Sequence, residues 1–217
     1  RGLEFEPAFF LDALQSERDQ GVTIDTTQIF FKTKKRNYVF IDSPGHKEFI
    51  KNMITGASSA DLAFLILDAQ EGIKEQTTKH AYLLKLLGIK NVVSLVNKMD
   101  IIKYCEETFN NLKNDLDTFL SKIGIHSIYT IPISAKTGDN VYLRSKKMKW
   151  YKGKICVDAI DDFEIKTQTN SSDLRLPVQD IYKINNKRII VGRVESGSLM
   201  VNDELLFLPS NEKVKIK

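Results

Sequence analysis

The sequence predicts an α/β protein in which helices cover both faces of a mostly parallel sheet, followed by the start of a β-barrel. Up to residue 150, short apolar, β-branched segments alternate with amphipathic helical segments, which is the pattern of parallel sheets. Beyond residue 174 only short strand-like segments remain, separated by turn residues. We therefore expect one domain over residues 1–165, a polar linker over 166–173 and an incomplete β-barrel over 174–217.

The strands of the first domain are recognised by their apolar runs. Such runs are typical of strands that are buried on both faces of a parallel sheet. A further strand precedes the first of them across the basic turn 33–36, which predicts an antiparallel hairpin over residues 27–42. The four expected buried strands are residues 37–42, 62–68, 91–97 and 128–134.

The helices between these strands are recognised by their periodicity. Residues 106–122 carry one apolar stripe and end before Gly124, as an amphipathic helix does. Residues 74–87 show a similar pattern, and Gly88 ends it. We expect the inward face of this second helix to consist of Tyr82, Leu83, Leu86 and Leu87. Shorter helices are expected at residues 47–57 and 155–164.

Composition excludes several classes of protein. The 217 residues contain 32 basic and 28 acidic side chains, and this mild, dispersed excess does not indicate nucleic acid as a partner. The basic clusters 32–36 and 144–149 are expected to be solvated turns. Two cysteines and three histidines do not suffice for a disulfide framework or a metal cluster. The longest apolar run, residues 62–67, is too short to cross a membrane, and no signal peptide is visible, so we expect a cytoplasmic location.

Two loops at strand ends have the chemistry of guanine recognition. In "NKMD", the carboxylate of Asp100 can accept both adjacent donors of guanine, which adenine does not supply, and the stem of Lys98 can cover the ring. Asn97 can either reach the base edge or hold the loop. In "SAK", the N–H of Ala135 can donate to guanine O6, and Lys136 can cover the opposite face of the ring.

A third loop, "DSPGH", has the chemistry of a γ-phosphate site. Asp42 at a strand end can hold Mg²⁺ through water, and Gly45 lets a backbone N–H approach the phosphate without a Cβ. His46 can orient the attacking water, as a glutamine does in other GTPases. The helix that follows would move with the state of the phosphate. Each motif alone is weak, but three in order at strand ends favour a GTPase.

The stretch "ERDQGVTID" allows two interpretations. In one, a helix ends, Gly21 turns the chain and a strand begins. In the other, Thr23 is a switch threonine, with its hydroxyl on Mg²⁺ and its N–H on the γ-phosphate. The three loops favour the second interpretation.

These residues resemble the translation-factor-like GTPases. The resemblance rests on "ERDQGVTID", "DSPGHKEFIKNMITGASSAD", "NKMD", "SAKTGDN" and "LRLPVQDIYKI", and it covers nearly the whole chain. It implies a GTPase-type fold that binds GTP or GDP with Mg²⁺, and it implies that Ser134 joins the guanine-selecting residues. Within the family, "EQTTKHAYLLKLLGIKNVV" and "KRIIVGRVESG" are most similar to the GTPase subunit of bacterial sulfate adenylyltransferase.

That resemblance implies an enzyme complex. The family's large subunit couples GTP hydrolysis to the formation of adenylyl sulfate from ATP and sulfate, and the adenylylation site lies on a small partner subunit. An alternative is an elongation factor Tu-like GTPase that delivers aminoacyl-tRNA. The phosphate loop G-x-x-x-x-G-K-[ST] does not occur in these 217 residues, so we expect it upstream of Arg1. If the native protein lacks that loop, a partner-binding module that does not hydrolyse GTP is the second alternative.

Overall fold

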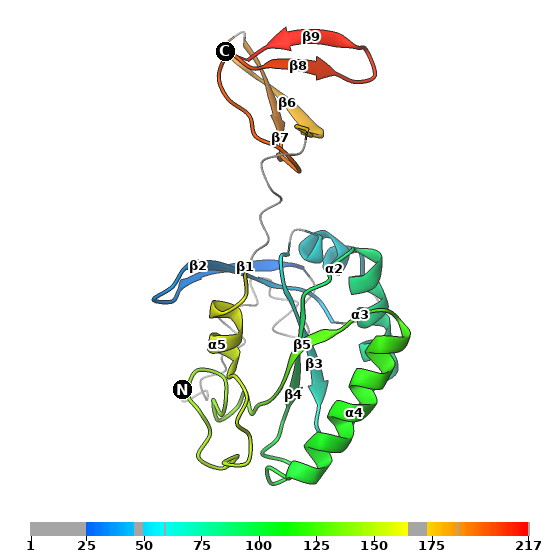
Figure 1. Ribbon diagram of the computed structural model, residues 1–217, viewed down its shortest axis with the longest axis vertical. Coiled ribbons are helices and arrows are strands. Elements are labelled where there is room, and N and C mark those ends of the chain that lie inside the picture. Colours follow the sequence, from blue (N-terminus) through cyan, green and yellow to red (C-terminus); the bar gives the residue numbers. More distant parts are fainter. Residues whose placement is uncertain (1–24, 46–49, 59, 165–172, 186, 217) are drawn as a thin grey trace, which may run out of the picture. The chain divides into compact units, whose positions relative to one another are not determined.

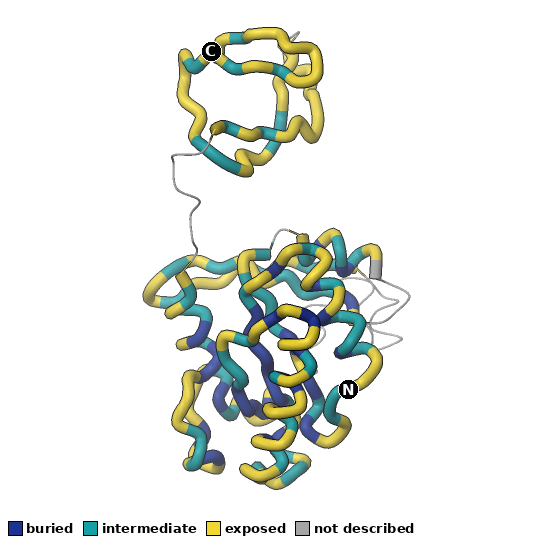
Figure 2. The backbone as a smooth tube through the Cα atoms, turned by 45° about the vertical axis from the view of Figure 1, so that its right-hand side comes forward, coloured by how far each residue is buried: buried dark blue, intermediate teal, exposed yellow. Residues whose placement is uncertain are grey.

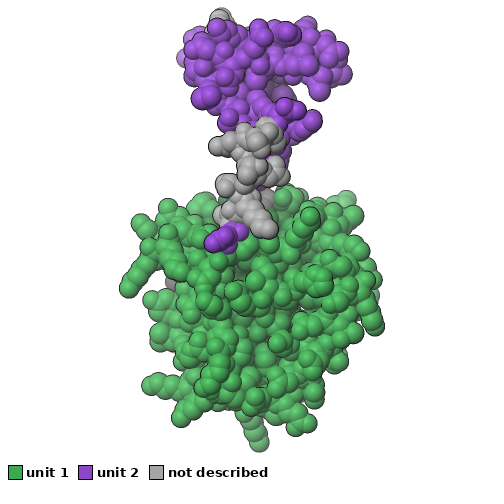
Figure 3. All heavy atoms as spheres, in the orientation of Figure 1, with its two compact units in different colours: residues 1–163 green, residues 164–217 purple. Residues whose placement is uncertain are grey.

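The computed structural model describes residues 25–45, 50–58, 60–164, 173–185 and 187–216. The chain divides into two compact units, residues 1–163 and 164–217, which are coloured separately in Figure 3. Each unit is described by itself.

A parallel sheet forms the centre of the first unit. Its strand order is β3–β4–β5, and both pairings are parallel. β4 consists almost entirely of buried residues, because it is the middle strand and is covered on both faces. The predicted strands are confirmed to within two residues at each end. The observed bounds are β3 (Ala63–Asp68), β4 (Val92–Asn97) and β5 (Ser127–Pro132).

Helices cover both faces of this sheet, as the sequence predicts (Figure 1). Helices α3 (Glu75–Leu86) and α4 (Glu106–Lys122) pack against one face, and α5 (Cys156–Asp161) packs against the other. The bounds of α4 agree with the prediction, and Gly124 follows it with a φ of 76°, a left-handed conformation that suits glycine.

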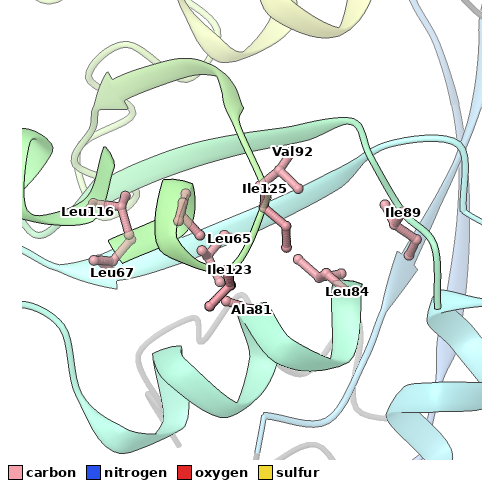
Figure 4. Packing of buried hydrophobic residues seen from close by; sticks show 10 residues of the cluster. Leu65, Leu67, Ala81, Leu84, Ile89, Val92, Leu116, Ile123 and Ile125 are labelled. Atoms are coloured by element: carbon pink, nitrogen blue, oxygen red, sulfur yellow. The ribbon is translucent and has the colours of Figure 1, made fainter. Parts of the chain in front are cut away.

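The core lies between the sheet and helices α3 and α4. In Figure 4, Leu65 and Leu67 of the sheet face Ala81 and Leu84 of α3. Leu116 of α4 is fully buried in the same cluster. In Figure 2 the buried segments of the first unit accordingly gather at the sheet. On the opposite face, however, Ile66 of β3 remains 55% exposed, so the prediction that this strand is buried on both faces is wrong.

The inward face of α3 differs from the prediction. The buried residues are Thr77, Ala81 and Leu84, whereas Tyr82 and Leu86 are 52% and 78% exposed. Positions 77, 81 and 84 lie on one side of a helix because they are spaced by four and three residues. Leu83 and Leu87 are half-buried, and Leu87 packs against the core cluster, so the prediction is wrong for Tyr82 and Leu86 and confirmed for Leu87.

The predicted hairpin is confirmed, but Asn37, Val39 and Phe40 are exposed, so the prediction that residues 37–42 form a strand buried on both faces is wrong. β1 (Thr27–Lys32) and β2 (Asn37–Asp42) pair antiparallel, with Thr27 opposite Asp42, and within the described ranges they form a two-stranded sheet of their own. Helix α2 (Ile50–Ala57) packs beside the hairpin through Gly56. A Cβ at Gly56 would lie 2.5 Å from Cγ2 of Thr26 and 2.8 Å from Oγ of Ser43, so a larger residue there would require these side chains to shift.

The basic turn of the hairpin is exposed at Lys34 and Lys35, as expected of a solvated turn, and it also contacts the end of α5. The Thr33 hydroxyl donates to Oδ1 of Asp161 at 2.7 Å, and Nζ of Lys35 lies 2.8 Å from Oδ1 of Asp162. The Tyr38 hydroxyl also donates to Asp161. These two carboxylates therefore attach the turn of the hairpin to the end of α5.

The second unit consists of two antiparallel strand pairs, β6 with β7 and β8 with β9. All residues of β6 are exposed. The bounds are β6 (Val178–Ile184), β7 (Lys187–Gly192), β8 (Glu204–Phe207) and β9 (Glu212–Lys215). In the parts of both units that the structure describes, no helix is long and apolar enough to cross a membrane.

Candidate functional site

The first predicted base loop begins where β4 ends. Val96 is fully buried, Asn97 is half-buried, and Lys98 turns the chain with a φ of 64°. Met99 returns to the interior and donates its N–H to the carbonyl of Ile133, 3.1 Å away, beyond the end of β5. The alternation of buried and accessible residues places Lys98 and Asp100 on the same side of this loop, toward solvent.

Two side-chain hydrogen bonds join this loop to the second one. Oδ1 of Asn97 accepts the N–H of Ala135 at 2.9 Å, so Asn97 adopts the loop-holding role of the two that the sequence allows. The Ser134 hydroxyl, fully buried, donates to Oδ1 of Asp100 at 2.6 Å. Loops 37 residues apart in the sequence, counted from Asn97 to Ser134, are thus held in one arrangement.

The carboxylate of Asp100 retains capacity for further donors, because a carboxylate offers about four lone-pair sites and Ser134 uses one of them. The N–H of Ala135 is engaged by Asn97, so a contact with guanine O6 requires that bond to be exchanged. Lys136 is exposed beside them. The structure therefore brings together all six predicted base-site residues: Asn97, Lys98, Asp100, Ser134, Ala135 and Lys136.

Asp68 is a charged neighbour of this site that sequence reasoning missed. Its Oδ2 lies 2.6 Å from Nζ of Lys98, and its Oδ1 accepts the N–H of Gln70 at 2.7 Å. Although burial of the carboxyl acts in the opposite direction, the hydrogen bond and charge of Lys98 hold the pKa of Asp68 below its usual value. The hydrogen bond from Lys98 to Asp68 raises the pKa of Lys98. An acidic residue at the carboxyl end of β3 was the available signal.

The predicted γ-phosphate loop, "DSPGH", is described only in part. Asp42 ends β2 and is half-buried, Pro44 is buried and Gly45 is exposed. The carbonyl of Gly45 accepts a hydrogen bond from Nε2 of His80 on α3 at 3.1 Å. Thr23 and His46 lie outside the described residues. The structure thus places Asp42 and Gly45 at the end of the hairpin, and it adds His80 as a support that the sequence did not indicate.

His80 holds this loop as a neutral imidazole more readily than an exposed histidine would. Partial burial lowers the pKa of His80, against the hydrogen bond to Gly45, which acts in the opposite direction. The neutral ring donates one N–H, and Gly45 accepts it. α3 is therefore connected to the described end of the phosphate loop.

A magnesium site built only from described residues is not present: within them, no three His, Cys, Asp or Glu side chains gather closely enough to hold a metal. Mg²⁺ in nucleotide sites needs only one or two protein ligands, with water and phosphate oxygens completing its shell. The half-buried carboxylate of Asp42 at a strand end fits that requirement.

Polar loops at the carboxyl ends of parallel strands, with helices on both faces of the sheet, define the class of nucleotide-binding α/β domains. A family model described as the elongation factor Tu GTP binding domain matches residues 3–180. The chain therefore belongs to the family of elongation factor Tu GTP-binding domains, and the predicted GTPase-type fold is confirmed.

The chain is similar to curated proteins of two kinds. It is 41% identical over 217 residues to sulfate adenylyltransferase subunit 1 of Cellvibrio japonicus, covering 100% of this chain and 46% of that protein. It is 42% identical over 216 residues to the bifunctional enzyme CysN/CysC of Rhodopirellula baltica, covering 98% and 33%. It is also 41% identical over 212 residues to elongation factor 1-alpha of Thermococcus gammatolerans, covering 97% and 50%. The chain thus spans half or less of the length of these relatives.

Solved structures agree on the fold. The chain superposes on a bacterial selenocysteine-specific elongation factor EF-Sec with a TM-score of 0.57 and 25% identity, covering 94% of this chain and 34% of that one. The elongation factor SelB of Methanococcus maripaludis, in complex with a GTP analogue, gives a TM-score of 0.55 and 28% identity, covering 89% and 40%.

Proposed function

We propose that this chain is the GTP-binding part of the large subunit of a sulfate adenylyltransferase, in which GTP hydrolysis is coupled to the formation of adenylyl sulfate from ATP and sulfate. The observation that carries the proposal is that two loops at the ends of β4 and β5 are hydrogen-bonded to each other. Ser134 donates to Asp100, and Ala135 donates to Asn97. The similarity to proteins named sulfate adenylyltransferase subunit 1 supports the choice of reaction.

In this proposal the two loops select guanine. Asp100 accepts the N1–H and N2–H₂ donors of the base, and Ser134 holds that carboxylate in place. The stem of Lys98, directed by Asp68, covers one face of the ring, and Lys136 covers the other. A base without the two adjacent donors leaves the carboxylate of Asp100 without these partners, which disfavours that base.

The phosphate side serves hydrolysis. Asp42 and Thr23 would hold Mg²⁺, which supplies neutralising charge to the phosphate oxygens when it is bound. Gly45 and the N–H of Thr23 would contact the γ-phosphate, and His46 would orient the attacking water. His80 keeps the peptide group of Gly45 in place from α3.

The adenylylation chemistry belongs to a partner in this proposal. We assign no ATP or sulfate contact to any residue of this chain, and the relatives' names describe them as one numbered subunit of an enzyme. We therefore propose a small adenylyltransferase subunit as the partner. We also propose that residues 1–165 form the GTPase domain, and that residues 174–217 begin a β-barrel after a linker at 166–173.

An elongation factor that delivers aminoacyl-tRNA is the second candidate. The 41% identity to elongation factor 1-alpha of Thermococcus gammatolerans favours it specifically. The two candidates share the guanine site and differ in what GTP hydrolysis drives, so only a measurement of the coupled reaction distinguishes them.

The test is an assay of the native full-length protein, purified together with any subunit that accompanies it. Pyrophosphate release from ATP is followed with and without sulfate, and with and without GTP. We expect release to require sulfate and to rise several-fold with GTP. GTP hydrolysis that is indifferent to sulfate, together with binding of aminoacyl-tRNA, would support the elongation factor instead.

A matched pair of histidine variants tests the assignment of the water-orienting residue. His46→Ala is expected to abolish the stimulation by GTP while GTP still binds. His126→Ala is the control, because His126 is exposed next to β5 and outside the proposed site. Equal loss of stimulation in both variants would contradict the role of His46.

A further inference from the structure

A second connection joins the two base loops, beyond the bonds of Asn97 and Ser134. The hydroxyl of Tyr104 donates to Oδ2 of Asp139 at 3.2 Å. Tyr104 closes the loop that carries Asp100, and Asp139 closes the loop that carries Ser134. This contact is therefore made between the far ends of the two loops. Neither residue belongs to "NKMD" or "SAK", although Asp139 lies in the longer motif "SAKTGDN".

Tyr104 is fixed on its own side by the backbone. Its φ of 58° is left-handed, which is unusual for a tyrosine, and its N–H donates to the carbonyl of Met99 at 2.8 Å. Its carbonyl accepts the indole N–H of Trp150 at 3.1 Å. The preceding residue, Lys103, donates its N–H to the carbonyl of Asp100 at 3.2 Å. These backbone hydrogen bonds thus hold Tyr104 in a fixed position relative to the loop that carries Asp100.

Asp139 is fixed equally well on the other side. Its backbone carbonyl accepts the N–H of Ser134 at 3.2 Å, and its Oδ2 also accepts the Thr137 hydroxyl at 2.6 Å. Although burial of the carboxyl acts in the opposite direction, hydrogen bonds from Thr137, Ser145 and Tyr104 hold the pKa of Asp139 below its usual value. The acceptor is therefore an ionised carboxylate, which makes a stronger hydrogen bond than a neutral oxygen would.

Lys147 determines the direction of the bond between them. Its Nζ lies 2.8 Å from the Tyr104 hydroxyl oxygen and 3.9 Å from Oδ2 of Asp139. An ammonium group can only donate, so the tyrosine oxygen accepts from Lys147 and its proton points toward Asp139. The segment 144–149 is exposed at Lys146, Lys147 and Lys149, as expected of a solvated turn, and Lys147 also completes this bridge.

We propose that the Tyr104–Asp139 bridge sets the separation of the two base loops, and that Tyr104 is a positioning residue for the contact between Asp100 and guanine. The inference rests on the proposed GTP-binding function. It extends that function because it assigns part of the base specificity to side chains that do not touch the nucleotide.

The experiment compares two nucleotides on the native full-length protein. Inosine diphosphate lacks only the 2-amino group of GDP, so the ratio of the two dissociation constants reports how well Asp100 is placed against that group. Tyr104→Phe removes the hydroxyl and keeps the ring, while Lys147 remains beside Asp139. Tyr142→Phe is the control, because Tyr142 is 72% exposed and loses the same atom.

We expect Tyr104→Phe to weaken GDP binding about three- to tenfold, the net effect of one typical hydrogen bond, and to weaken the binding of inosine diphosphate less. The preference for GDP should therefore fall, whereas Tyr142→Phe should leave both constants unchanged. An unchanged ratio, or equal weakening of both nucleotides, would overturn the positioning role. Asp139→Asn, which removes the charge of the acceptor, should also lower the preference for GDP over inosine diphosphate.

Two controls separate this inference from the function on which it rests. If the unsubstituted protein binds neither nucleotide, the proposed function itself fails. If Tyr104→Phe lowers the melting temperature without changing the ratio, the bridge is only structural and the inference fails while the function stands.

Discussion

The two ends of the proposed nucleotide site are built differently. The base end follows β4 and β5, in which Val96 and Pro132 near the strand ends are buried, and its loops are joined by hydrogen bonds that involve Asn97 and Ser134. The described phosphate end follows β2, a strand of a two-stranded hairpin whose residues are mostly exposed. It is held by the packing of α2 at Gly56 and by the bond from His80.

The two ends thus show two ways in which a protein can position the groups that bind a ligand. Loops that leave buried strands inherit the rigidity of the core and can hold hydrogen-bonding groups ready for a base. A loop at the end of an exposed hairpin can change its position at lower cost, which suits a segment that responds to the presence of a γ-phosphate. Base recognition is therefore expected to be sensitive to side-chain chemistry, and the phosphate side to packing.

The largest expected effect lies at the base end. Asp100→Asn should weaken GDP binding about a hundredfold or more, because two hydrogen bonds to a charged acceptor are lost. Binding of xanthosine diphosphate should strengthen relative to GDP, since the new amide can donate to the carbonyl at position 2. Calorimetry on the native protein measures both. Asp115→Asn, an exposed change on α4, is the control, and equal GDP binding by the two variants would contradict the assignment.

The second effect concerns packing at the phosphate end. Gly56→Ala places a methyl group 2.5 Å from Thr26 and 2.8 Å from Ser43, so we expect the free energy of unfolding to fall by about 1–3 kcal/mol. Thermal unfolding measures it, with Lys51→Ala on the exposed side of α2 as the control. A variant as stable as the wild type would mean that α2 and the hairpin adjust freely.

A smaller effect is expected for the support of Lys98. Asp68→Asn removes the partner of its ammonium group but keeps an oxygen for the N–H of Gln70. The Lys98 side chain is 53% exposed, so GDP binding should weaken only about two- to fivefold, in keeping with a partly solvated ion pair. Glu107→Gln, an exposed change on α4, is the control. If Lys98→Met and the double variant Asp68→Asn/Lys98→Met bind GDP equally, Asp68 acts through Lys98. Weaker GDP binding by the double variant than by Lys98→Met would contradict that.

The smallest effect concerns the far end of the hairpin. Hydrogen bonds from Lys154 and Lys35 lower the pKa of Asp162 from 3.8 to about 2. Because the pKa is lower in the folded state, the stability that this carboxylate contributes is present above pH 3.8 and is lost as the pH falls toward 2. A carboxyl titration followed by NMR should show the pKa rising when both lysines are replaced by alanine. Lys34→Ala on the same turn should leave it unchanged.

Much of the fold follows from local patterns in the sequence. The bounds of α4, β1 and β2 agree with the prediction because their signals lie within the segments themselves: an apolar stripe that ends at Gly124, and two apolar runs around a basic turn. The buried face of α3 follows only in part, because burial depends on how the helix is oriented against the sheet, which buries Ala81 and leaves Leu86 78% exposed.

The site divides in the same way. The sequence alone determined the order of the three loops, their place at strand ends and the residue types that suit guanine and phosphate, because each of these properties is contained in a few adjacent residues. Only the tertiary structure decided that Asp68 holds Lys98, that His80 holds Gly45 and that Tyr104 meets Asp139. These partners are 30 to 35 residues apart in the sequence. Such pairs produce no local pattern in the sequence, because their contacts arise from the packing of strands and helices and not from the spacing of adjacent residues.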